Sequence, residues 1–373
     1  MNKTSIILLS YNTEDYTRLC IESIRNFTPR GSYELIVIDN ASRDGSLAYL
    51  RAQKDLRLVE NAENRGFPAA CNQGMALAMP RNDLLLLNSD TIVTPHWLEN
   101  LQAALHSAEN IGAAGCVTNS CSHFQQIPVS YADLDEMLAF AERFNVSQSM
   151  LWQPWHALTA FCLLVRRKAY AEVGGFDEAF SPGNYEDDDL CIRLRDAGYS
   201  LLLCQDTFIH HFGSASFRKD EDAQKQAEKE KSYRALLQRN VQRLRKKHGL
   251  HSDWNTLHGI LTAVPGELLG EGRRLLLVGM SVCTDAYIQR AAHPGLRVSC
   301  VTWDRDAAAR TQQDLAIRYA QQTAESLAAA LSDLQEMYDV IVIPGGLGDL
   351  PEAAQMRDVL GRHLVPGGGF YEG

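Results

Sequence analysis

The sequence lacks several features that mark specialised classes of protein. None of its apolar stretches approaches the ~20 residues that a helix needs to span a bilayer. Its nine cysteines are an odd number and include no Cys-x-x-Cys pair, so they fit a reducing compartment better than a disulfide framework. The chain also has no excess of basic residues. Its net charge of −10 argues against nonspecific nucleic-acid binding.

Internal repeats and low-complexity tracts are absent as well. The first residues, Met1 to Thr4, lead directly into a predicted strand, so we expect no signal peptide. A hydrophobic content of 45% is ordinary for a globular protein, and 373 residues suit two domains better than one. These observations favour a cytoplasmic protein of two domains with no nucleic-acid partner.

An acidic run is the most informative stretch that is present. The four carboxylates from Glu186 to Asp189 open a predicted helix, which Leu190 and Leu194 anchor on its apolar side. Adjacent carboxylates repel one another, and a helix N-terminus offsets only part of that repulsion. A bound cation or a cationic partner would offset more. The alternative is a solvated acidic cap that binds nothing.

Two predicted strands end in acids. Residues 33–38 form an apolar strand that ends at Asp39, and residues 84–87 form another that is followed by Asn88-Ser89-Asp90. Ligands of open α/β sheets bind just beyond the carboxyl ends of such strands. A carboxylate there can hold Mg²⁺ or Mn²⁺, which takes its remaining ligands from diphosphate oxygens.

Two further segments complete the N-terminal pattern. A first strand, residues 5–12, is followed by a helix whose start Asn12 can cap. Residues 64–74 enter another helix at Gly66, whose freedom to adopt a positive φ suits a phosphate-binding turn. Each segment taken alone is as consistent with scaffold as with a site.

Together and in this order, these motifs resemble the family-two glycosyltransferases with the GT-A fold, and within them the bacterial rhamnosyltransferase-type branch. The matching segments are residues 10–12, 39–46, 64–67, 72–74, 88–90, 173–178, 185–190, 211 and 213–214. The resemblance covers residues 1–217 and implies a GT-A α/β domain, in which helices flank a Rossmann-like mixed sheet. One triplet departs from the family pattern, because it reads Asn88-Ser89-Asp90 where two acids are expected.

The resemblance also implies a reaction and roles for residues. The reaction is an inverting transfer of a sugar from a nucleotide diphosphate to a hydroxyl, with Asp187 as base and Glu186 orienting it. Asp90 and His211 would hold Mn²⁺ or Mg²⁺, with His210 as the alternative ligand. Asp39 would read the nucleotide base. The residues expected to bind the donor are Ser10, Asn12, Asp39, Asn64, Arg65, Gly66 and Asn88.

The same resemblance suggests partners. It favours dTDP-L-rhamnose as the donor, then UDP-linked sugars, and leaves GDP-linked sugars open. The acceptor would be a cell-surface glycan, a lipid-linked glycan or a protein. One rival, a nucleotide-sugar pyrophosphorylase, would need a glycine-rich basic loop where this chain has Thr13-Glu14-Asp15. Another rival is a noncatalytic nucleotide-sugar-binding scaffold. Such a scaffold would not need Asp39, Asp90, Asp187 and His211 together.

Residues 218–272 are predicted to form a charged helical extension and a linker. Apolar residues recur at helical spacing from Tyr233 to Leu244, and residues 234–247 are basic and contain no acid. The plainer interpretation is a solvated helix packed on the catalytic domain. The sharper one is peripheral contact with the inner face of an anionic membrane, where a lipid-linked acceptor would be found.

From residue 273 to residue 373 a second, smaller Rossmann-like domain is predicted. Residues 275–279, 298–304 and 338–344 look like buried strands, and one helical stretch is expected over 306–337. The order resembles a class I methyltransferase, with Asp304 ending the second strand. Its first turn keeps one glycine, Gly279, where that family has several. We therefore predict a degenerate or truncated methyltransferase-like module, with a bifunctional glycosyltransferase and methyltransferase as the alternative.

Overall fold

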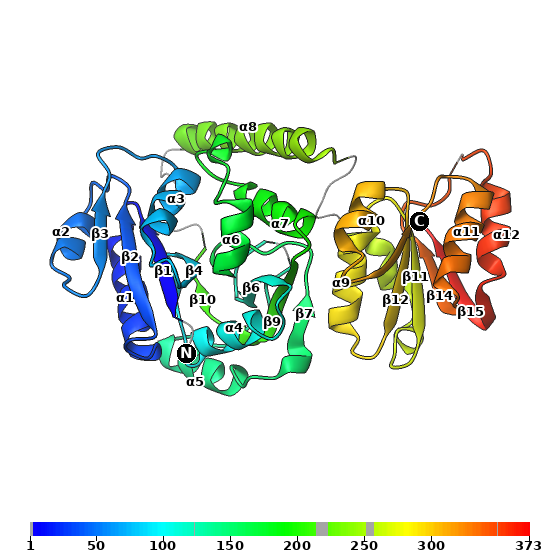
Figure 1. Cartoon of the computed structure of the whole chain (residues 1–373), viewed down its shortest axis with the longest axis horizontal. Helices are drawn as coiled ribbons and strands as arrows, with labels where there is room; N and C mark the ends of the chain where they lie inside the picture. The colour runs from blue at the N-terminus through cyan, green and yellow to red at the C-terminus, as the bar shows by residue number, and fades with distance from the viewer. Residues whose placement is uncertain (1–2, 123, 214–222, 251–256, 349) are drawn as a thin grey trace. The chain divides into compact units, whose positions relative to one another are not determined.

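The computed structural model describes residues 3–122, 124–213, 223–250, 257–348 and 350–373 (Figure 1). The chain divides into two compact units, Met1–Leu244 and Arg245–Gly373. The division falls inside the extension that the sequence predicts over residues 218–272. Each unit has its own sheet, one mixed and one parallel, which agrees with the predicted fold class of two α/β domains.

Within the described residues, unit 1 is built on a mixed sheet of eight strands in the order β3-β2-β1-β4-β8-β6-β9-β7. β8 runs antiparallel to both neighbours, and β7 runs antiparallel to β9. The strands are β1 (Thr4–Ser10), β2 (Tyr33–Asp39), β3 (Arg57–Glu60), β4 (Asp83–Asn88), β6 (Ile111–Val117), β7 (Trp152–Pro154), β8 (Cys162–Val165) and β9 (Ser200–Phe208). A small separate sheet pairs β5 (Thr91–Ile92) with β10 (His210–His211).

Helices cover both faces of the mixed sheet (Figure 1). They are α1 (Glu14–Phe27), α2 (Ser46–Arg51), α3 (Phe67–Leu77), α4 (Trp97–Leu105), α5 (Leu134–Phe144), α6 (Arg167–Val173), α7 (Glu186–Asp196) and the 3-10 helices η1 (Ser149–Leu151) and η2 (Glu178–Phe180). Ile6 and Leu8 of β1 belong to the core formed with α1 and α4. Ile7 points the other way, toward α3, where a Cβ on Gly74 would lie 2.5 Å from Ile7 Cγ2. The apolar run of β1 is therefore buried on both faces, as in parallel sheets generally.

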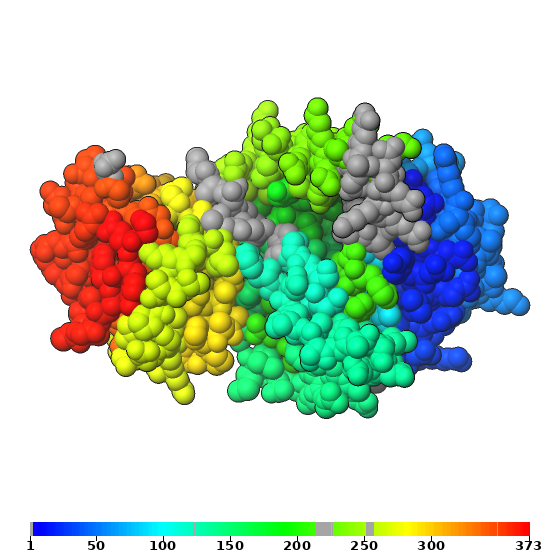
Figure 2. All heavy atoms as spheres, turned by 180° about the vertical axis from the view of Figure 1, so that it is seen from behind, coloured from blue at the N-terminus to red at the C-terminus, as the bar shows by residue number. Residues whose placement is uncertain are grey.

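The last helix of unit 1, α8 (Ala223–His248), lies along the outside of the unit up to Leu244 (Figures 1 and 2). Its outer face is exposed, while Asn240 and Leu244 are buried. The sequence predicts the extension from residue 218, but residues 218–222 lie outside the described part of the chain. No helix that the structure describes is both long and apolar enough to cross a membrane.

In the described part of unit 2, five parallel strands have the order β13-β12-β11-β14-β15. The strands are β11 (Arg274–Gly279), β12 (Arg297–Thr302), β13 (Ala316–Tyr319), β14 (Tyr338–Ile343) and β15 (Leu364–Glu372). The helices are η4 (Gly259–Ala263), η5 (Gly266–Leu268), α9 (Val282–Ala292), α10 (Arg305–Thr311), α11 (Ala324–Leu334) and α12 (Ala353–Gly361). α9 packs on one face of the sheet, and α11 with α12 on the other (Figure 1).

One prediction for this unit was wrong. The helical stretch expected over 306–337 is divided into α10, the edge strand β13 and α11. In β13, Ile317 is buried while Ala316 and Arg318 are exposed. This alternation has the two-residue period of a strand, but over four residues it is too short to stand out from a helical pattern.

Candidate active site

The predicted metal ligands Asp90 and His211 meet where β5 pairs with β10. His211 lies opposite Thr91 in this ladder, and the N–H of Phe212 donates to the carbonyl of Asp90 at 2.9 Å. His211 Nε2 lies 3.2 Å from Asp90 Oδ1, and each side chain is only 11% exposed. The backbone ladder therefore brings together two residues that are far apart in the sequence.

The orientation of His211 is set by two residues that the sequence analysis did not single out. Nδ1 lies 2.7 Å from the carbonyl oxygen of Ser120, which can only accept, so Nδ1 carries the proton. The carboxamide of Asn119 exchanges two hydrogen bonds with the backbone of His211, at 2.9 and 3.0 Å. Nε2 is consequently left as an acceptor, and it is buried without a hydrogen-bond partner.

This donor set fits a divalent cation. An imidazole whose other nitrogen is bonded to a carbonyl, next to a carboxylate, is the usual arrangement of a metal-ligating histidine. No group of three His, Cys, Asp or Glu side chains suited to a metal ion occurs among the described residues, so a cation here would need oxygens from a ligand as well. The alternative ligand, His210, is bonded elsewhere: its Nδ1 lies 2.6 Å from Tyr131 Oη, and burial lowers its pKa.

The acidic run at the start of α7 is buried. The residues from Glu186 to Asp189 are 0–9% exposed, so the alternative of a solvated acidic cap is wrong. Asp189 pairs with Arg193 one turn later at 2.8 Å. Burial, together with the neighbouring charge of Asp187, raises the pKa of Glu186 well above its ordinary value. Glu186 Oε2 has no hydrogen-bond partner.

The start of β8 connects the acidic helix to the Asp90–His211 pair. The N–H of Ala160 donates to Asp187 Oδ2 at 3.4 Å. The ring of the next residue, Phe161, stacks on the imidazole of His211 with centroids 5.3 Å apart. The carbonyl of Phe161 accepts from the N–H of Asn88 at 2.9 Å. Two adjacent residues therefore contact the predicted base, a predicted metal ligand and the carboxyl end of β4.

A second group of predicted residues gathers at the ends of β1 and β2. Asp39 Oδ2 accepts from the N–H of Ser42 at 3.0 Å, whereas Asp39 Oδ1 is buried with no partner. The N–H of Asn12 donates to Ser42 Oγ at 3.1 Å, and its carboxamide oxygen accepts from the N–H of Arg43 at 2.7 Å. The capping role considered for Asn12 is wrong, because α1 begins at Glu14 with Thr13 in the capping position.

Asn40, which the sequence analysis did not assign, organises the turn before α3. Its Nδ2 donates to Asn64 Oδ1 at 2.8 Å, and its Oδ1 accepts from the N–H of Arg65 at 3.1 Å. Gly66 adopts φ +80, and a Cβ there would lie 3.1 Å from Pro182 Cα, next to α7. The only signal for Asn40 in the sequence is its place directly after Asp39.

Three of the predicted donor-binding residues contribute differently. Ser10 is buried, and its hydroxyl lies 3.2 Å from that of Thr17. Asn88 is joined to Phe161 through its backbone, and the side chain of Arg65 is exposed. Direct contact of any of the three with a nucleotide stays a prediction.

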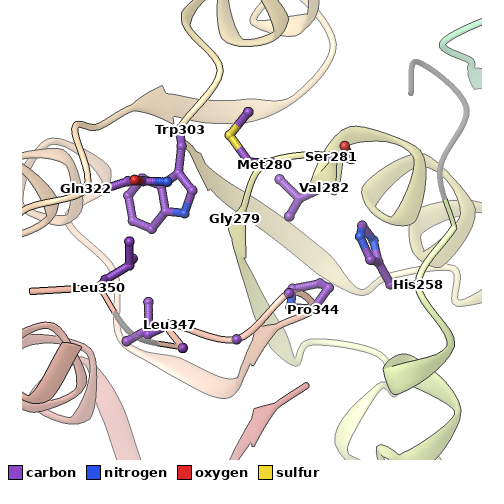
Figure 3. A pocket seen from close by; sticks show the side chains of 13 residues that line it. His258, Gly279, Met280, Ser281, Val282, Trp303, Gln322, Pro344, Leu347 and Leu350 are labelled. Carbon is purple, nitrogen blue, oxygen red and sulfur yellow. The ribbon is translucent and has the colours of Figure 1, made fainter. Parts of the chain in front are cut away.

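Unit 2 holds a separate cavity of about 290 Å³ at the carboxyl ends of β11, β12 and β14 (Figure 3). Trp303 and Gln322 lie on one side of it and His258 on the other, and none of the described residues that line it is an Asp or Glu. His258 is fixed by Asp285, through its N–H at 3.0 Å and its Nδ1 at 2.7 Å. Asp304, the acid after β12, accepts from the N–H groups of residues 306 and 307 and caps α10. The methyltransferase-like interpretation stays a prediction.

Comparison with known proteins identifies the larger part of unit 1. Residues 5–174 match the model of the family described as Glycosyl transferase family 2. This part of unit 1 is therefore similar to the family 2 glycosyltransferases. The match, together with the mixed sheet and its flanking helices, confirms the predicted GT-A fold. It ends before α7 and His211, so the acidic helix and the second metal ligand lie outside the matched residues.

Curated relatives of this part of the chain come from bacteria and archaea. The O-antigen biosynthesis protein RfbC of Myxococcus xanthus is 29% identical over 58% of this chain and 18% of that protein. The N-acetylglucosaminyl-diphospho-decaprenol L-rhamnosyltransferase of Mycobacterium tuberculosis is 22% identical over 63% of this chain and 84% of that protein. The match spans 26% or less of the length of three of the relatives, RfbC among them.

Among solved structures, the mannosyltransferase PcManGT from Pyrobaculum calidifontis, in complex with GDP-Man and Mn²⁺, is 21% identical. The likeness covers 58% of this chain and 59% of that one, with a TM-score of 0.44.

Proposed function

We propose that unit 1 transfers a sugar from a nucleotide diphosphate to an acceptor hydroxyl, with inversion at the anomeric carbon. The observation that carries this proposal is the convergence at Ala160 and Phe161, which join Asp187 to the Asp90–His211 pair. A buried carboxylate beside a cation-binding pair is the combination that proton removal and diphosphate departure require.

The proposed chemistry uses one base. Asp187 takes the proton of the acceptor hydroxyl as its oxygen bonds to the anomeric carbon. The bond from that carbon to the diphosphate oxygen breaks, and its electron pair leaves with the nucleoside diphosphate. Direct displacement needs one carboxylate, in contrast to glycoside hydrolysis, in which a second must protonate the leaving oxygen. Glu186, whose pKa is raised mainly by burial, orients Asp187.

Asp90 and His211 are the residues that would hold Mn²⁺ or Mg²⁺. The cation would supply positive charge at the diphosphate as negative charge develops there. His211 is prepared for this role because Ser120 fixes its tautomer and leaves Nε2 as a buried acceptor. Nitrogen ligation favours Mn²⁺ over Mg²⁺.

The donor is proposed to be dTDP-L-rhamnose or a UDP-linked sugar, and the acceptor a cell-surface, lipid-linked or protein-borne glycan. The relative from Mycobacterium tuberculosis supports this choice, because its name specifies an L-rhamnosyltransferase that acts on a lipid-linked sugar. A place in the cytoplasm, at the inner face of the membrane through residues 234–247, is proposed with it. Exposed basic side chains such as Arg245 and Lys246 are consistent with contact to an anionic surface.

A panel of dTDP-, UDP- and GDP-linked sugars, scored by release of nucleoside diphosphate, tests the proposal directly. Asp187→Asn keeps the shape of the side chain but cannot accept a proton at neutral pH. We expect turnover to fall by about 100-fold or more, the usual scale for a lost general base, with donor binding nearly unchanged.

The matched control lies on the same helix. Asp196→Asn makes the same chemical change at an exposed position of α7 and should leave turnover unaltered. The neighbouring Asp188→Asn tests the register of the acidic run. If it removed turnover while Asp187→Asn did not, the base would be Asp188. Binding of nucleotide without any turnover on the whole panel would favour the noncatalytic scaffold.

A further inference from the structure

The loop that leads into α7 has an unusual backbone. Gly183, Asn184 and Tyr185 adopt φ values of +157, +74 and +73 in succession, directly before the acidic run. Residues other than glycine rarely occupy this region, and they stay there only where the surrounding structure holds them. The same loop reaches the Asn64–Phe67 turn, because the N–H of Phe67 donates to the carbonyl of Pro182 at 2.9 Å.

A single side chain of α8 holds this loop. Asn240 Nδ2 lies 2.8 Å from the carbonyl of Phe180, 3.0 Å from that of Gly183 and 2.9 Å from that of Asn184. An amide has two N–H donors, so they are shared among three carbonyls. Asn240 is 0% exposed, although it lies in a helix that is otherwise dense in charged residues.

Neighbouring residues of α8 support the same contact. Arg239 Nε donates to Asn240 Oδ1 at 3.0 Å, which fixes which end of the amide faces the loop. Its Nη2 donates to the carbonyl of Ser181 at 2.5 Å. Nearly two turns before Asn240, the hydroxyl of Tyr233 donates to Asn184 Oδ1 at 3.2 Å. The helix therefore contacts the loop at residues 180, 181, 183 and 184.

We propose that Asn240 is a positioning residue for sugar transfer: it fixes the loop that aims the start of α7, and with it Asp187, at the substrate. This inference rests on the proposed function. It gives α8 a part in the catalytic domain that neither a solvated extension nor a membrane contact requires. Its importance follows from the steep dependence of catalysis on alignment, because a misplacement of ~1 Å can cost about 100-fold in rate.

The test compares two amide-to-acid substitutions on one helix of the full chain. Asn240→Asp replaces the shared donors with oxygens that the three carbonyls repel, while Gln238→Glu adds the same charge at an exposed position. We expect kcat of Asn240→Asp to fall by about 10-fold or more. The donor KM should change by less than about threefold, because Asp39, Asp90 and His211 lie on other elements. The loop does reach the Asn64–Phe67 turn, but through the backbone N–H of Phe67, which is not among the residues proposed to bind the donor. Gln238→Glu should match the wild type in both constants.

A merely structural role predicts a different outcome. Asn240→Asp would then lower the melting temperature and leave kcat of the folded fraction unchanged, which would overturn the inference. If Asn240→Asp does not fold, Arg239→Gln decides, because it removes one support of the amide and one contact to the loop. A fall in its kcat at unchanged donor KM supports the inference, and an unchanged kcat refutes it.

A double variant separates this inference from the proposed function. If Asn240 acts through Asp187, adding Asn240→Asp to Asp187→Asn should reduce single-turnover rates by little more than Asp187→Asn alone. Losses that multiply would contradict the positioning role. Full activity of Asp187→Asn would refute the proposed base, whereas an inactive Asp187→Asn beside a fully active Asn240→Asp would refute only the positioning.

Discussion

The two units place an acid at the end of their second strand and use it in different ways. In unit 1, Asp39 ends β2; Oδ2 accepts from Ser42, and the buried Oδ1 has no partner. In unit 2, Asp304 follows β12 and its Oδ1 accepts from two N–H groups at the start of α10. The first acid has one oxygen without a hydrogen-bond partner, and the second accepts hydrogen bonds from the backbone of the helix that follows it.

The same contrast extends to the rest of each strand edge. Unit 1 leaves Glu186 Oε2 and His211 Nε2 buried without hydrogen-bond partners as well. Buried polar atoms are nearly always satisfied, so the exceptions at the end of β2, at the start of α7 and in β10 are where a ligand would find unpaired polar atoms. In the described part of unit 2, no residue that lines the cavity has such an atom. Unsatisfied acceptors, more than strand order, therefore distinguish a candidate active site from its architectural equivalent.

The strongest way to break this comparison is to remove the acceptors that we assign to the cation. Asp90→Ala and His211→Ala should each lose most transfer activity while the fold survives, because their side chains lie at a site and not in the apolar core. EDTA should abolish wild-type activity, and Mn²⁺ or Mg²⁺ should restore it. Rates are measured by release of nucleoside diphosphate, and Mn²⁺ binding by calorimetry.

A matched pair at the other end of β4 is the control. His106 Nε2 lies 2.7 Å from Asp83 Oδ2 at the amino end of that strand. His106→Ala removes a histidine paired with an aspartate but should leave transfer unchanged. Full activity in EDTA would refute the metal assignment and leave His211 as a contact to phosphate.

The sequence predicted the acids of unit 1 better than the groups that hold them. The resemblance to the glycosyltransferase family pairs Asp90 with His211, and the structure places His211 Nε2 3.2 Å from Asp90 Oδ1. Asn40, Asn119 and Asn240 were missed, because an amide that bonds distant backbone groups leaves no periodic trace. Their roles depend on long-range approach, which a single sequence does not encode locally. For the same reason the short strand β13 was taken for part of a helix.

A second prediction compares the two strand-end acids directly. Asp39→Asn removes the charge but keeps the shape, so we expect nucleotide binding to weaken by about tenfold or more, the scale of a lost charge-assisted hydrogen bond. Asp39 is 0% exposed, so neighbouring groups must move before a nucleotide can contact its Oδ1. Calorimetry with UDP and dTDP in the presence of Mn²⁺ measures the change.

Asp304→Ala is the partner variant for this comparison. It should lower the free energy of unfolding by about 1 kcal/mol, the usual cost of a lost helix cap, and leave nucleotide binding unchanged. Equal effects of the two variants on nucleotide binding would remove the distinction between the two edges.

A third prediction concerns Glu186. Because its pKa is raised in the folded chain, its contribution to the free energy of unfolding depends on pH. The folded chain binds the proton of the Glu186 carboxyl more tightly than the unfolded chain does. The stability that this protonated carboxyl contributes is therefore fully present below the unfolded pKa of about 4.3. It is lost as pH rises through the folded pKa. Glu186→Gln is neutral at every pH, so it should raise the melting temperature by a few degrees at pH 8 and little at pH 4.

Thermal melts across this pH range test the prediction, with Glu99→Gln as the exposed control. A gain in stability for Glu186→Gln that is the same at both pH values would contradict it. Transfer activity of Glu186→Gln should fall even where its stability rises, because the group orients the proposed base.

For unit 2 we expect no effect at all: S-adenosylmethionine should not stabilise it against thermal unfolding. A ligand at 100 times its Kd stabilises a folded protein by about 2.7 kcal/mol, which is several degrees for a unit of this size. S-adenosylmethionine should cause no such shift in the full chain. Asp304 is occupied as a helix cap, the described residues that line the cavity include no carboxylate, and Gly279 is the single glycine of the turn after β11. UDP with Mn²⁺ serves as the positive control, since its proposed site lies in unit 1. A clear shift with S-adenosylmethionine would show that a strand edge with satisfied acids still binds a cofactor, and the bifunctional alternative would then be favoured.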